Sequence, residues 1–154
     1  MNKRKNKQKG PGIIARNKQV WHDFDVLETF EAGIVLLGTE VKTLRQGRAN
    51  LSDSYARIED HEVFVLNLDI PVYSHGSVHN HEPKRKRKLL LHRREIRRLM
   101  AKVLERGFTL VPTKLYFKRG FAKLEIALAK GKSKTDKRQD IKRREHEREM
   151  QRFA

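Results

Sequence analysis

The sequence contains no cysteine among its 154 residues. This absence excludes disulfide bridges, thiolate zinc sites and cysteine nucleophiles. Long hydrophobic runs are also lacking: stretches such as Ile34–Leu37 and Leu89–Leu91 are far too short to span a bilayer. The basic N-terminus is followed by no apolar stretch, so no signal peptide is predicted. We also find no lipidation motif and no membrane-binding amphipathic helix, and we therefore expect a cytoplasmic protein with no membrane partner.

Acidic residues are few compared with basic ones, and the excess is unevenly placed. Lys and Arg number 36 against 19 Asp and Glu, which gives a formal net charge of +17. Residues 1–20 carry seven cations and no acid, residues 84–98 carry nine against one, and residues 130–154 carry ten against five. The rest of the chain is slightly acidic. Three basic segments around a near-neutral globule indicate a partner that is a polyanion, and nucleic acid is the commonest one.

Apolar alternation predicts six antiparallel strands in three hairpins. The first hairpin joins residues 24–30 to 34–37 through a turn at Glu31-Ala32-Gly33, the second joins 54–59 to 62–68, and the third joins 109–117 to 121–129. Thr39 is predicted to cap a short helix over Glu40–Gln46, and a long amphipathic helix is predicted from about His92 to Arg106. Three such hairpins close most economically into a barrel. The predicted fold class is therefore mainly β with peripheral helices: an OB-like six-stranded antiparallel β-barrel.

The same patterns predict three regions along the chain. Residues 1–12 are expected to form a disordered basic arm, residues 13–129 the barrel domain with its helices, and residues 130–154 a basic tail. In the tail only Ile141, Met150 and Phe153 are large and apolar, too thinly spread to bury a face. We expect the tail to be disordered alone and to become helical on a partner.

Two short motifs suggest ligand sites. Gly131-Lys132-Ser133 resembles the end of a phosphate loop, but the motif needs a glycine where this chain has Ile126, so no nucleotide site is predicted. A cluster of three histidines and one acid could hold a metal ion for RNA hydrolysis: His75, His79, His81 and Glu82. Because no helix or strand is predicted to hold them, a solvated polar loop is the favoured interpretation, and no metal site is expected.

Several other polar and aromatic side chains leave alternatives open. Glu28, Glu31 and Glu40 could form a catalytic carboxylate pair, balance neighbouring basic patches, or accept hydrogen bonds from RNA bases. Trp21 and Phe24 could pack in the core or stack on an unpaired base, and packing is the commoner role of large aromatics.

Five blocks of sequence resemble one known family in their order and spacing. The blocks are Gly33-Ile34 with Gly38-Thr39-Glu40-Val41-Lys42, Asn50-Leu51-Ser52-Asp53-Ser54-Tyr55, Asn80-His81-Glu82-Pro83, Arg87-Lys88-Leu89-Leu90-Leu91-His92, and Ala129-Lys130-Gly131-Lys132 followed by Asp136-Lys137-Arg138. The resemblance is to the SsrA-binding proteins (small protein B) and extends from Ile14 to about Arg148. It implies an OB-type barrel, in agreement with the hairpins.

The resemblance also implies a function. Such a protein binds the tRNA-like domain of transfer-messenger RNA, and EF-Tu carries the alanyl end of that RNA into a stalled ribosome with an empty decoding site. The candidate RNA-binding residues are Asn17, Glu31, Lys42, Arg45, Lys88, Leu90 and Lys123. The tail would occupy the vacant messenger channel, and its candidate ribosome-binding residues are Lys130, Gly131, Lys132, Asp136, Lys137 and Arg138.

These observations favour a monomeric RNA-binding adaptor that is not an enzyme and needs no cofactor. The alternative within the same class is a ribosomal or generic structured-RNA-binding protein, which would share the charge pattern but depend on no single small RNA. The alternative from another functional class, the enzymes, is a metal-dependent RNA hydrolase built on the histidine loop.

Overall fold

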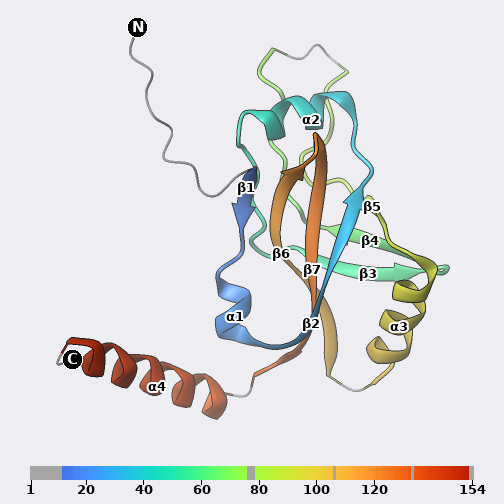
Figure 1. The fold of residues 1–154 in the computed structure, drawn as a ribbon. Coiled ribbons are helices and arrows are strands. Elements are labelled where there is room, and N and C mark those ends of the chain that lie inside the picture. Colours follow the sequence, from blue (N-terminus) through green and yellow to red (C-terminus); the bar gives the residue numbers. More distant parts are fainter. Residues whose placement is uncertain (1–11, 76–78, 106, 133, 153–154) are drawn as a thin grey trace, which may run out of the picture.

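The computed structural model describes residues 12–75, 79–105, 107–132 and 134–152 (Figure 1). The described elements, in chain order, are β1 Ile13–Arg16, α1 Gln19–Asp23, β2 Phe24–Ile34, α2 Gly38–Arg45, β3 Tyr55–Glu59, β4 Glu62–Leu66, β5 Arg87–Leu90, α3 Arg93–Val103, β6 Phe108–Lys118, β7 Phe121–Gly131 and α4 Lys134–Arg152. The predicted disordered arm lies outside the described residues apart from Gly12. None of the described helices is long and apolar enough to cross a membrane.

The strands form one antiparallel sheet that curls into a partly closed ring. Its order is β1-β6-β3-β4-β5-β2-β7, and an additional pairing of β6 with β7 brings the two ends together. Six strands therefore make the ring, while β1 pairs with β6 beside it. The long strands β2, β6 and β7 stand side by side, and the β3–β4 hairpin runs across them (Figure 1). The predicted fold class, an OB-like barrel with peripheral helices, is confirmed.

The first predicted hairpin is wrong. Residues 31–33 form no turn, because β2 is continuous from Phe24 to Ile34 and pairs with β7 as far as Gly33. The sixth strand of the ring is β5, in a basic stretch whose alternation is hidden by Arg87, which points inward. Gly33 is needed for close approach, since a Cβ there would lie 3.2 Å from the Cβ of Leu90 on β5.

The other two predicted hairpins are confirmed. Asp60-His61 joins β3 to β4 and Arg119-Gly120 joins β6 to β7, each as a two-residue turn with positive φ at both positions. This geometry matches the twist of the flanking strands. The short helix α1 was not predicted, because five residues are too few to show a repeating helical pattern.

The core fills the ring and is closed at one end by α3. Leu124, Ile126 and Leu128 of β7 point inward and are fully buried, and Leu99 of α3 packs against the same cluster. A smaller apolar cluster lies under α1, where Val20 covers the outward side of the sheet. The outward face is thus covered at one end and open at the other.

A buried ion pair ties α2 to β5. The side chains of Glu40 and Arg87 are fully buried and hydrogen-bonded to each other. Arg87 also donates to the carbonyl oxygens of Leu68 at 2.6 Å and Pro83 at 2.9 Å. Arg85 donates to Glu40 Oε1 at 2.5 Å. The pair therefore fixes the long segment between β4 and β5, whose described residues form no strand.

Glu40 also caps α2. Its Oε1 accepts the backbone N–H of Leu37 at 2.8 Å, so Leu37 is the residue at the N-cap, in place of the predicted Thr39. Burial alone would raise the pKa of the Glu40 carboxyl. Hydrogen bonds from Arg85 and Leu37 and the charge of Arg87 outweigh that effect, so this pKa lies below its usual value. Glu40 is accordingly neither a catalytic acid nor an RNA contact.

The Thr39 hydroxyl instead bonds His81 Nδ1 at 2.8 Å, and His81 Nε2 lies 2.8 Å from the carbonyl oxygen of Ile70. The imidazole is buried. A carbonyl can only accept, so Nε2 carries the proton, and in the neutral ring Nδ1 accepts from Thr39. The interpretation of His81 as part of a solvated loop is therefore wrong: it is an internal cross-link.

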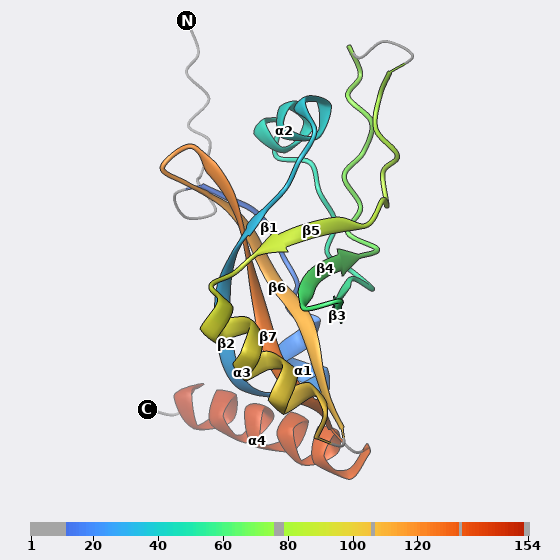
Figure 2. The ribbon, with the colours of Figure 1, turned by 90° about the vertical axis from the view of Figure 1, so that its right-hand side faces the viewer.

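The C-terminal segment forms α4, which lies beside α1 at the end of the barrel away from α2 (Figures 1 and 2). Arg144 Nη2 donates to the carbonyl oxygen of Trp21 at 3.4 Å. Strand β7 continues past Ala129, so Lys130 and Gly131 belong to the sheet. The segment is helical here; that it is disordered in the free protein stays a prediction.

We predict that Glu40→Ala lowers the free energy of unfolding by about 3–5 kcal/mol, because it leaves the Arg87 charge buried without a partner. Glu62→Ala is the control, since it breaks the exposed pair with Lys88 and should cost at most about 1 kcal/mol. Because the pKa of Glu40 is lowered, its contribution is complete at neutral pH and is lost as the pH falls through that lowered value. Urea unfolding measures both variants, and equal losses would contradict the assignment.

Candidate nucleic-acid interface

The open part of the outward face is built from cross-strand rows of side chains. In one row Leu90 of β5 is paired with Gly33 of β2, Gly33 with Lys123 of β7, and Lys123 with Tyr116 of β6. In the next row the paired residues are Glu31, Glu125, Lys114 and Arg16. Paired residues in a sheet point to the same side. Residues up to about a hundred positions apart in the sequence thereby share one surface.

Glu31 is the acid around which this surface is organised. Its Oε2 accepts a short hydrogen bond from the Tyr116 hydroxyl, and its Oε1 lies 3.2 Å from Lys118 Nζ. The hydrogen bond from Tyr116, followed by the bond and charge of Lys118 and the charge of Lys123, holds the pKa of Glu31 below its usual value despite slight burial. Burial and the Glu31 carboxylate together raise the pKa of the Tyr116 hydroxyl. Glu31 is thus an oriented, ionised acceptor that remains partly exposed.

Leu90 and Lys123 line a hollow of about 260 Å³ above Gly33. Its rim includes Phe121, which is 71% exposed, and Leu90, which is 53% exposed. Val41 of α2 also lines it. Phe121 was not predicted from the sequence. Its place directly after a two-residue turn, where a polar residue is usual, was the signal that could have identified it.

Asn17 follows β1 and lies at the other side of the face. Its backbone N–H donates to the Thr113 carbonyl oxygen at 2.7 Å, and its Nδ2 lies 3.4 Å from the Leu51 carbonyl oxygen. Together with Trp21 and Lys114 it lines a shallow hollow of about 240 Å³. Trp21 is half exposed there, whereas Phe24 packs against the cluster under α1. Of the two aromatics, Trp21 alone remains available for stacking.

The other predicted RNA-binding cations lie outside these rows. Lys42 on α2 lies over the ring of Tyr73 at 5.5 Å, and Arg45 is exposed at the end of the same helix. Lys88 points outward from β5 and pairs with Glu62 at 2.9 Å. The structure therefore brings Asn17, Glu31, Leu90 and Lys123 to one face and does not bring Lys42, Arg45 and Lys88 into the same rows.

The predicted tail residues divide between β7 and α4. Lys130 lies over the ring of Phe108, and the backbone N–H of Lys132 donates to the Asp23 carbonyl oxygen at 2.9 Å. Asp136, Lys137 and Arg138 lie in the first turns of α4, and Arg138 is exposed. They are thus carried at the end of the barrel opposite α2 (Figure 1).

The histidine loop offers little to a metal. Both ring nitrogens of His81 are engaged inside the protein, and His75 makes an edge contact with Tyr73 at 5.6 Å between ring centroids. Among the described residues no grouping of histidines and acids could hold a metal ion.

Comparison with known proteins identifies the family. The sequence profile of the SmpB protein family matches residues 14–154. The chain belongs to the SmpB family. Curated relatives include the SsrA-binding protein of Syntrophobacter fumaroxidans, 60% identical over 92% of this chain and 88% of that one, and that of Geobacillus kaustophilus, 57% identical over 94% of both. SmpB proteins bind RNA and are not enzymes, so the enzymatic alternatives are excluded.

A solved SmpB structure has the same fold. It is described as "tmRNA-SmpB: a journey to the center of the bacterial ribosome" and matches with a TM-score of 0.66 and 49% sequence identity. The match covers 82% of this chain and 93% of that one. The resemblance inferred from the five sequence blocks is therefore confirmed.

We predict that Tyr116→Phe raises the pKa of Glu31 toward its usual value of 4.5, because it removes the hydrogen bond that lowers it most. NMR titration of the Glu31 carboxyl carbon measures this shift. Tyr73→Phe is the control, since Tyr73 lies near α2 and makes no described contact with Glu31. An unchanged Glu31 pKa in Tyr116→Phe would show that the hydroxyl does not hold the carboxylate.

Proposed function

We propose that this chain binds the tRNA-like domain of transfer-messenger RNA through its open outward face and brings that RNA to stalled ribosomes for trans-translation. The observation that carries the proposal is the convergence of Asn17, Glu31, Leu90 and Lys123 on one surface from four separate segments. Family membership and the tmRNA–SmpB structural match support the same partner.

Each group on this face suits a different part of a folded RNA. Lysines such as Lys123 and Lys114 neutralise phosphates and position the duplex. Glu31 accepts hydrogen bonds from the amino or imino groups of an exposed base edge. The hollow between Leu90 and Phe121 accommodates an apolar base face. Such a surface selects a folded RNA shape more than a linear sequence.

We further propose that α4 and the residues before it enter the empty messenger channel, with Gly131, Asp136, Lys137 and Arg138 at the decoding centre. The segment has ten cations and few apolar residues, so it cannot stabilise itself by packing. Ribosomal RNA phosphates would neutralise its charge and favour the helix. In this proposal the protein acts as a cytoplasmic monomer and meets EF-Tu only through the shared RNA.

Binding to the isolated tRNA-like domain should weaken steeply with salt, with a log–log slope of around −3 to −4 if about five phosphates are neutralised. Lys123→Ala should reduce the magnitude of that slope by up to about one. Lys86→Ala is the matched control, because Lys86 precedes β5 and pairs with Glu59 of β3, outside the rows of the open face. Glu31→Ala should weaken binding with little change in slope. Filter binding at several salt concentrations measures all four proteins; a Glu31→Ala variant with normal affinity would contradict the proposed surface.

A chain ending at Lys132 should melt like the full protein and keep its affinity for the tRNA-like domain, yet lose peptide tagging on stalled ribosomes. A chain ending at Ala129 is the comparison and should also melt lower, because Lys130 pairs with Phe108 and Gly131 with Phe24. Replacing Lys137 and Arg138 by Glu should reproduce the loss of tagging, while exchanging them for Arg and Lys should not. Normal tagging by the chain ending at Lys132 would refute the proposed role of the tail.

A further inference from the structure

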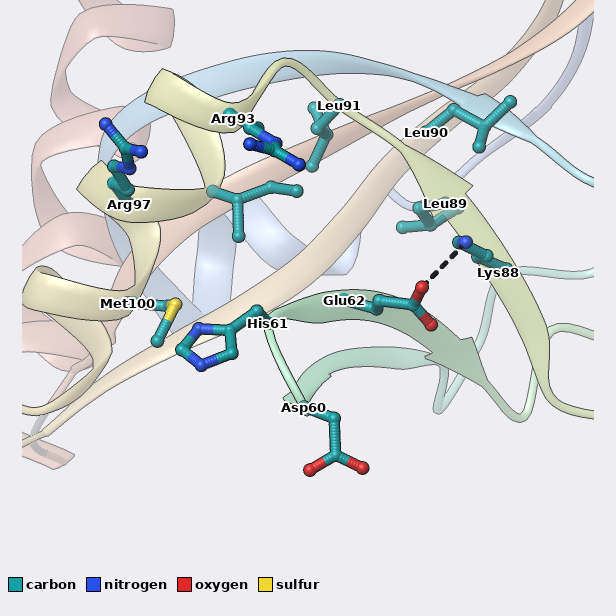
Figure 3. Close-up of a pocket in the computed structure, with 11 residues that line it drawn as sticks. Asp60, His61, Glu62, Lys88, Leu89, Leu90, Leu91, Arg93, Arg97 and Met100 are labelled. Atoms are coloured by element: carbon teal, nitrogen blue, oxygen red, sulfur yellow. Dashed lines mark hydrogen bonds and ion pairs between the residues drawn. The ribbon is translucent and has the colours of Figure 1, made fainter.

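A hollow of about 650 Å³ lies between α3 and the β3–β4 turn, next to the surface described above, with which it shares Leu90. Figure 3 shows the side chains that line it. One helical face of α3 forms its wall, with Arg93, Ile96, Arg97 and Met100 at helical spacing. Leu89 and Leu91, on either side of the end of β5, also line it.

The wall and floor are apolar, and the rim is cationic. Ile96 and Met100 are partly buried, whereas Arg93 and Arg97 are exposed. Of the acids at the edge, Glu62 is held by Lys88 at 2.9 Å, and the carboxylate of Asp60 is directed away from α3 (Figure 3). Arg93 and Arg97 therefore both line the hollow, and among the described residues no ion pair joins either of them to Asp60 or Glu62.

His61 of the β3–β4 turn lines the hollow together with Met100 of α3 (Figure 3). The φ angle of His61 is +63°, a conformation that favours glycine. The other two-residue turn of the barrel has Gly120 at the corresponding position. A histidine at this position carries a conformational cost that glycine would avoid, and such costs are concentrated at binding sites.

We propose that this hollow binds one unpaired RNA nucleotide. The base lies on Ile96 and Met100 with the His61 ring against it, and Arg93 and Arg97 hold its phosphate. A flat apolar base with an attached anion matches an apolar floor under a rim of guanidinium groups, and aromatic contact with unpaired bases tolerates any sequence. The inference rests on the proposed RNA-binding function and adds a nucleotide pocket separate from the surface around Glu31.

The pocket is tested on the full chain with a single-stranded adenosine pentanucleotide, monitored through the NMR signals of the Met100 methyl group and the His61 ring. A pentamer of abasic ribose phosphates of equal charge is the control. We expect the adenosine oligomer to shift both signals and the abasic oligomer to leave them in place. Equal shifts from both would overturn the pocket and leave phosphate attraction alone. If neither oligomer shifts the two NMR signals, the proposal is also overturned. A hollow that accepts a peptide would give that result.

His61→Gly separates binding from folding, because glycine relieves the positive φ. The melting temperature should not fall, while affinity for the adenosine oligomer should drop about five-fold or more. Arg93→Ala should weaken binding more than Arg94→Ala, its neighbour on α3, which does not line the hollow. Unchanged affinity in His61→Gly would refute the proposal.

Two sources could supply the nucleotide: the carried RNA or ribosomal RNA. Affinity of His61→Gly for whole transfer-messenger RNA and for vacant ribosomes distinguishes them, since the loss should appear with the RNA that supplies the base. If neither affinity changes, the pocket has no role in either complex. That result would leave the proposed function intact, because Lys123→Ala and the tail truncation test it separately.

Discussion

The buried pair of Glu40 and Arg87 is the interaction on which the arrangement of this protein depends. It joins a helix to a strand far away in the sequence and satisfies the backbone carbonyls of the chain that connects β4 to β5. A pair of this kind is costly to desolvate and is stable only when its remaining donors and acceptors are satisfied, as they are here by Leu37, Leu68 and Pro83. Because this pair holds β5 in register, Leu90 lies beside Gly33 and forms the edge of the open face.

The Glu40–Arg87 pair also explains why one strand of the ring was not predicted from the sequence, whereas two hairpins were. The hairpins around Asp60-His61 and Arg119-Gly120 were predictable because turn chemistry and strand alternation are local. Strand β5 was not, since an arginine at an inward position breaks the apolar pattern unless its distant partner is known. The turn expected at Glu31-Ala32-Gly33 is absent for a related reason. Gly33 allows the neighbouring strand β5 to approach closely and does not reverse the chain.

The candidate surface was predictable only in part. Asn17, Glu31, Leu90 and Lys123 came from a resemblance to a family, and the sheet register supplies the physical reason they belong together. Tyr116 could not be inferred, because its proximity to Glu31 arises from pairing across β7 and β2. For Phe121 the only local signal was its place directly after the β6–β7 turn. His81 shows the opposite error, since it was expected in a solvated loop although its ring is buried. Glu40, for which three roles were open, balances the charges of Arg85 and Arg87 from a buried position.

The path of the last strand has a mechanical consequence. β7 is paired on both sides along nearly its whole length, with β2 and with β6, and it leads directly into the tail. Tension applied to the tail along the direction of β7 would act on both hydrogen-bonded ladders in shear, so that many bonds would resist together. A strand at the edge of the sheet would instead peel away one bond at a time. The segment that leaves the barrel is therefore anchored through two hydrogen-bonded ladders at once.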